Sequence, residues 1–204
     1  LAVRVPIAGM ALLPALFGMP AMLFPMHIAF LELIIDPACS IAFENEPAEA
    51  DIMRRPPRDP NVPLFGGMTL LLALLQGVGV LVVVMGAYIF AQQQLPEAEA
   101  RAFAFVTLVM SNLALIFSNR TRAHSLLASL RTPNPVLWGV TGVTLLILML
   151  SLYVPALSRL LRFAPLPFHE LVLALALGVA SVIWFQIIRM MMPGSAIRGG
   201  QLPA

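Results

Sequence analysis

The chain has 204 residues, of which 60% are hydrophobic and only 11% charged, with a formal net charge of +2. A soluble domain is about 45–50% apolar and about 25% charged, so this composition excludes an ordinary soluble domain and predicts an integral membrane protein. The small net charge argues against nucleic acid as a partner, and the single cysteine, Cys39, excludes an internal disulfide.

Six apolar blocks predict an all-α, polytopic membrane bundle of six transmembrane helices, in one domain that covers residues 1–204. Each block reaches or approaches the roughly 17–25 residues that a helix needs to cross a bilayer. Small residues in the third block (Ala73, Gly77 and Gly86) predict close helix contacts there. In chain order, the expected spans are residues 2–17, 23–43, 64–91, 102–118, 136–154 and 168–192.

Two polar connections, residues 44–63 and 119–135, are predicted to be cytoplasmic loops. The first contains five prolines and is expected to be extended and stiff, because proline fixes φ and lacks an amide donor. All twelve basic residues are arginines, and placing both termini in the cytoplasm leaves nine of them inside and three outside. This distribution satisfies the positive-inside rule. The absence of lysine is typical of a GC-rich bacterial genome, so we expect a bacterial plasma membrane.

Two carboxylates, Glu32 and Asp36, interrupt the second span. A charged side chain at the centre of a bilayer costs about 2.5–3.5 kcal/mol on insertion scales, so a pair of them indicates a function. They are four residues apart and therefore share one face of a helix, where both can offer oxygens to one hard cation. The sequence thus predicts a cation site; the alternative is a protonated acid that is hydrogen-bonded to a neighbouring helix.

Other residues add to this prediction. Pro37 directly follows Asp36 and is expected to break the helix there, which would expose backbone oxygens as further ligands. Asn112, in the fourth span, either supplies a ligand oxygen or joins two helices by hydrogen bonds, and the sequence favours neither. His27 is interpreted as a packing residue, with a proton relay as the alternative.

Several motifs together resemble one family. They are Gly18-Met19-Pro20, then Pro25, then the segment from Glu32 to Asp36, and then the loop sequence DIMRRPPRDP at residues 51–60. In this order the motifs are similar to the C-terminal transmembrane domain of P-type cation-transporting ATPases, in particular the calcium-pump-like branch. The resemblance covers the whole chain and implies that its six spans are helices five to ten of a ten-helix pump.

The resemblance also implies roles for individual residues. Asp36 matches the aspartate that binds the transported ion, and Glu32 stands where calcium pumps usually have a ligating asparagine. Asn112 falls where two-site pumps carry a glutamate of the eighth helix. Ile7 replaces a fifth-helix glutamate, which implies a single ion site, and Pro37 replaces the usual glycine.

The function implied is ion translocation by an ATP-driven pump, with Ca²⁺ as the first choice of cation and Mn²⁺, Mg²⁺ or H⁺ as alternatives. The family's phosphorylation, nucleotide-binding and actuator domains are not in this sequence, so we expect that the chain cannot hydrolyse ATP alone. Its expected partners are that missing N-terminal part, which would bind Mg-ATP, and the lipid bilayer; no resident cofactor is expected. The other hypotheses are a non-catalytic membrane scaffold, a degenerate ATPase remnant and a proton-translocating pump.

Overall fold

The computed structural model describes residues 2–44, 67–120 and 135–191. All regular elements in these three ranges are α-helices, so the prediction of an all-α membrane bundle is confirmed. The two predicted cytoplasmic loops lie almost wholly outside the described residues. In chain order the helices are α1 (Arg4–Leu16), α2 (Pro25–Glu44), α3 (Gly67–Gln94), α4 (Glu97–Arg120), α6 (Pro135–Tyr153), α7 (Pro155–Leu160) and α8 (Phe168–Met191).

Each predicted span overlaps one helix of the described structure. Among the described residues, α3, α4, α6 and α8 are long and apolar enough to cross a membrane, whereas α1 and the segment Pro25–Ile35 of α2 are shorter apolar helices. That these two also cross remains a prediction. Helix α7 was not predicted: Val154 is extended (φ −81°, ψ 118°) and Pro155 starts a new helix, a position that proline favours.

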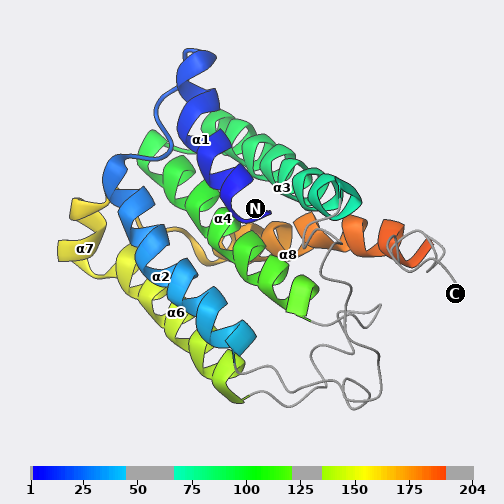
Figure 1. Cartoon of the computed structure of the whole chain (residues 1–204). Helices are drawn as coiled ribbons and strands as arrows, with labels where there is room; N and C mark the ends of the chain where they lie inside the picture. Colours follow the sequence, from blue (N-terminus) through cyan, green and yellow to red (C-terminus); the bar gives the residue numbers. More distant parts are fainter. Residues whose placement is uncertain (1, 45–66, 121–134, 192–204) are drawn as a thin grey trace, which may run out of the picture.

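Helix α4 forms the centre of the bundle (Figure 1). Within its membrane-length segment 83% of the residues are buried, compared with 28% in α3, 28% in α6 and 39% in α8. It packs on α8, α3, α2 and α6. The helices around it expose large apolar side chains, which suits contact with lipid; Val82, Leu146 and Ile187 are examples.

Close contacts between helices occur at particular glycines. A Cβ on Gly178 of α8 would lie 2.9 Å from the Thr107 carbonyl oxygen of α4, and a Cβ on Gly77 of α3 would lie 2.8 Å from the Ala2 carbonyl oxygen. Among the described residues, a Cβ on Gly86 would meet no atom within 4 Å. The predicted close contact is therefore confirmed at Gly77 and wrong at Gly86.

The predicted break at Pro37 is wrong, because α2 continues as one helix through this residue to Glu44. Proline removes the hydrogen bond that its own amide would donate to the carbonyl of Leu33, and its ring crowds that carbonyl, but neither effect ends the helix here. The hydrogen bonds of the flanking residues keep the helix continuous. The consequence for ligands is smaller than expected: one backbone carbonyl, at Leu33, loses its usual donor.

A buried arginine fastens one end of the bundle. Arg101, in the first turns of α4, donates a hydrogen bond to the Ala21 carbonyl oxygen (3.3 Å) and another to the Arg162 carbonyl oxygen (3.0 Å), and it forms an ion pair with Glu97. Arg162 has a positive φ of 52°, a region that side chains other than glycine rarely adopt. The bond from Arg101 to its carbonyl oxygen helps hold the backbone in this conformation. These contacts join the start of α4 to the α1–α2 turn and to the segment after α7.

Candidate cation site

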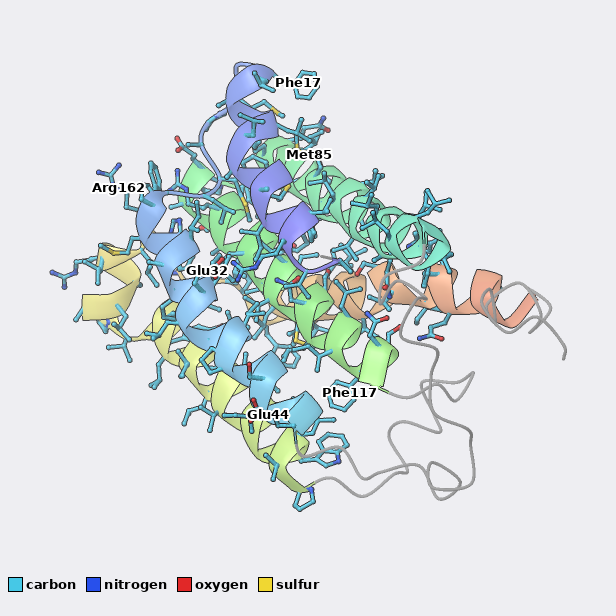
Figure 2. All side chains as sticks on the ribbon, viewed as in Figure 1. Phe17, Glu32, Glu44, Met85, Phe117 and Arg162 are labelled. Atoms are coloured by element: carbon cyan, nitrogen blue, oxygen red, sulfur yellow. The ribbon has the colours of Figure 1, made fainter. Side chains whose placement is uncertain are left out.

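Glu32 lies midway along α2 (Figure 2) and forms an ion pair with Arg4 of α1. The Glu32 side chain is 34% exposed and the Arg4 side chain 51% exposed. The sequence analysis predicted the carboxylate but missed its partner, which is 28 residues away in the chain. The available signal was Arg4 itself, a full charge within an apolar block.

Asp36 follows Glu32 by one helical turn within the continuous helix α2. Because positions four residues apart lie on the same face of an α-helix, the backbone places these two residues on one face, as the sequence predicted. The side chains of Asp36 and Cys39 lie outside the described part of the structure. The backbone of α2 alone therefore gives the position of Asp36.

Contacts between α2 and α4 fix the register of the two helices, which run side by side in the same direction (Figure 1). The rings of Phe30 and Phe105 are 6.1 Å apart. Further along, Ile34 and Ile35 lie around the same narrow apolar gap as Val109 of α4, a gap too small for a water molecule. If both helices continue in the same register, Asn112 of α4 lies one or two residues beyond the level of position 36 of α2.

Asn112 is fully buried, and neither its amide oxygen nor its amide nitrogen has a hydrogen-bond partner within the described chain. A buried polar group without a partner costs about 1–3 kcal/mol, so two on one side chain are unusual. The neighbouring Ser111 is fully paired: it donates to the Thr107 carbonyl oxygen (2.7 Å) and accepts from Ser181 (2.9 Å). Of the two interpretations of Asn112, hydrogen bonding between helices is not found in the described structure.

Two other side chains have buried atoms without a partner, and they differ from Asn112. Trp184 has an indole N–H, which is a donor only and cannot bind a cation. Glu170 lies in the first turn of α8. Its Oε2 is the atom without a partner, whereas its Oε1 is 3.2 Å from the His169 Nε2. Among the described residues, no group of three or more His, Cys, Asp or Glu side chains could hold a metal ion.

A second polar cluster, which the sequence analysis missed, joins α3, α4 and α8. Gln76 donates to Ser118 (3.3 Å) and accepts from Asn119 (3.1 Å), and Gln186 donates to the Ser118 hydroxyl. Every member therefore has a partner. Interhelical bonds of this kind stabilise membrane bundles, and we interpret the cluster as a structural link.

His27 is also fully paired. The amide of Phe24 donates to its Nδ1 (3.0 Å), so its Nε2 carries the proton and donates to the Leu161 carbonyl oxygen (2.7 Å). The ring stacks on Phe163, with centroids 4.9 Å apart. These contacts support the interpretation of His27 as a packing residue.

The fold is that of a helical membrane domain, with a buried amide at Asn112 and a half-buried carboxylate at Glu32. Comparisons with known proteins agree: residues 20–191 match the family model described as "Cation transporting ATPase, C-terminus". The chain belongs to this family and is the C-terminal membrane domain of a P-type cation-transporting ATPase, as its resemblance to the family indicated.

The chain is also similar to individual cation-transporting ATPases of bacteria. The chain is 28% identical to a calcium-transporting ATPase of Listeria monocytogenes over 166 residues, which are 80% of this chain and 18% of that protein. It is 28% identical to a calcium-transporting ATPase of Bacillus subtilis over 70% of this chain and 16% of that protein. It is also 28% identical to the probable cation-transporting ATPase F of Mycobacterium tuberculosis, over 86% of this chain and 20% of that protein. The chain thus spans about a fifth of the length of these relatives.

Proposed function

We propose that this chain forms the ion-translocating part of an ATP-driven cation pump, and that Glu32, Asp36 and Asn112 are ligands of the transported cation. The observation that carries the proposal is the fully buried Asn112 amide, which has no partner among the described residues and lies within two residues of the level of the Asp36 position of α2. An amide oxygen and carboxylate oxygens are the ligands that hard cations prefer. A cation bound there would satisfy an oxygen that the described protein leaves without a partner.

Ca²⁺ is the first choice of cargo, because two of the relatives are calcium-transporting ATPases. The described residues offer few ligands, and Ca²⁺ takes six to eight oxygens. We therefore infer that the remaining ligands come from the N-terminal part of the pump. That part would also bind Mg-ATP and become phosphorylated.

The proposal includes the orientation and the partners. Both termini face the cytoplasm of a bacterial plasma membrane, and the loop at residues 44–63 contacts the phosphorylation domain. The distribution of arginines supports this orientation, since nine of the twelve then lie on the cytoplasmic side.

The test uses the intact ATPase that carries this chain and measures cation-stimulated formation of the phosphoenzyme. We expect Asp36→Asn and Glu32→Gln each to raise the cation concentration for half-maximal phosphorylation by at least tenfold, since each removes a charged ligand. Glu99→Gln is the matched control, because Glu99 is a carboxylate in the first turn of α4, on another helix than the proposed carboxylate ligands and outside the loop at residues 44–63. Unchanged cation dependence in both site variants would show that these carboxylates are not ligands.

A further inference from the structure

The ion pair between Arg4 and Glu32 joins two helices that otherwise have different neighbours. Helix α1 packs mainly on α3, whereas α2 packs mainly on α6 and α4. Arg4 lies at the first position of α1 and Glu32 lies near the middle of α2. The pair therefore connects α1 directly to the helix that carries the proposed ligands.

This ion pair conflicts chemically with cation binding. A guanidinium is charged at every physiological pH, and it satisfies the lone pairs of a carboxylate with its N–H donors. A cation needs those same lone pairs. The Glu32 carboxylate thus cannot give all of its lone pairs to the Arg4 guanidinium and to a bound cation at the same time.

We propose that Arg4 is a tethered counter-cation that competes with the transported cation for Glu32. This inference rests on the proposed function of Glu32 as a ligand. In the cation-free state Arg4 neutralises Glu32, which avoids an uncompensated carboxylate inside the membrane. When the cation binds, Arg4 leaves Glu32 and the direct connection between α1 and α2 opens. Arg4 thereby sets the affinity of the site and links its occupancy to the relative position of two helices.

The first test measures cation-stimulated phosphorylation of the intact ATPase, with Ca²⁺ as the probe, in Arg4→Gln and Arg4→Lys. Removing the competitor should lower the Ca²⁺ concentration for half-maximal phosphorylation about tenfold in Arg4→Gln. Arg4→Lys keeps the charge and should stay within about threefold of the wild type. Arg159→Gln, at an exposed arginine of α7, is the matched control and should leave the affinity unchanged.

The second test separates competition from a merely structural ion pair through the thermal stability of the same proteins with and without saturating Ca²⁺. A ligand stabilises the state to which it binds, so a competitor must weaken the stabilising effect of Ca²⁺. Arg4→Gln should therefore lower the Tm only in the Ca²⁺-free protein. An equal loss of Tm in both conditions would mean that the pair is structural and would overturn the proposal.

The outcomes distinguish this inference from the function on which it rests. If the wild type forms phosphoenzyme in a Ca²⁺-dependent way and Arg4→Gln does not raise the Ca²⁺ affinity, only the role of Arg4 is wrong. A gain of affinity in Arg4→Lys equal to that in Arg4→Gln would also contradict it, because the charge would then be irrelevant. If the wild type shows no cation-dependent phosphorylation, the proposed function fails and this inference fails with it.

Discussion

Helix α4 has two polar sides of different character, one toward α8 and one level with the proposed site on α2. Toward α8, Ser111 is bonded to Ser181 at 2.9 Å, and Ser118 accepts a hydrogen bond from Gln186. At the level of the site, Asn112 has no partner for either amide atom within the described chain. Ser111 and Asn112 are adjacent in sequence and equally buried, so burial alone does not distinguish them. The two residues differ in their hydrogen bonds: Ser111 has partners, and Asn112 has none among the described residues.

The two sides also differ in how closely the backbones approach. At Gly178 the helices α4 and α8 are so close that an added Cβ would lie 2.4 Å from the Met110 Cβ. Helix α2 instead contains Pro37 and packs on α4 much less extensively than α8 does. A closely packed pair of helices such as α4 and α8 suits a static support, whereas a helix such as α2, which packs less extensively on α4 and forms an ion pair with α1, suits an element that moves.

The largest expected effect is on the packed side, in Gly178→Leu. The new side chain would have to displace the backbone of α4 at Thr107 and Ser111, since backbone atoms cannot rotate away. Overpacking of this kind costs about 1–3 kcal/mol or more, and here it would separate the two most extensively packed helices. We expect a large loss of thermal stability of the intact ATPase in detergent.

Gly86→Leu is the matched control for that prediction, because no atom of the described chain lies within 4 Å of a Cβ placed on Gly86. This variant should keep the Tm within a few degrees of the wild type. Equal losses of Tm in the two variants would show that α4 and α8 are not the rigid part of the bundle.

The next prediction compares two amides and expects opposite effects. Gln186→Leu removes a donor to Ser118 and should lower stability by about 1–2 kcal/mol without changing cation affinity. Asn112→Leu removes two unsatisfied buried atoms, so stability should stay equal or rise. If Asn112 is a ligand, cation affinity should fall about tenfold, which corresponds to about 1.4 kcal/mol. Tm and the cation dependence of phosphorylation, measured on both variants, check the four outcomes.

Two outcomes would contradict this comparison of Asn112 with Gln186. If Asn112→Leu loses stability and keeps its cation affinity, the residue has a structural partner and the two sides of α4 do not differ in function. If Gln186→Leu loses cation affinity, the ligand set extends to the α3–α4–α8 cluster.

The helices could be predicted from the sequence because helix formation in a membrane depends on local length and apolarity. The same property explains two errors. Sequence reasoning treated Pro37 as a break, although one missing hydrogen bond does not interrupt a helix that is held on both sides. It also left out α7, because the six residues Pro155–Leu160 lie between two predicted spans and are too few to cross a membrane.

The candidate site could be predicted only in part. Carboxylates at residues 32 and 36 are conspicuous within an apolar span, and their spacing follows from the helix itself. The partner of Glu32 and the isolation of Asn112 depend on which helices become neighbours. Arg4 and Glu32 are 28 residues apart, and Ser111 and Ser181 are 70 apart. Periodicity within one helix holds no information about such pairs.

The smallest predicted effect concerns Tyr88 of α3, which joins the packed side of the bundle to the α1–α2 turn. Its hydroxyl donates to the Pro20 carbonyl oxygen at 2.7 Å and accepts from Gln92 at 2.9 Å. Tyr88→Phe should lower stability by about 1 kcal/mol, the typical net value of one hydrogen bond. Tyr153→Phe removes a comparable bond, to the Leu166 carbonyl oxygen at 3.0 Å, but within the segment from α6 to α8. If α1 and α2 move during transport while α6 and α8 do not, only Tyr88→Phe should also change the rate of phosphoenzyme turnover. Equal turnover in both variants would mean that the α1–α2 turn stays fixed on α3 throughout the cycle.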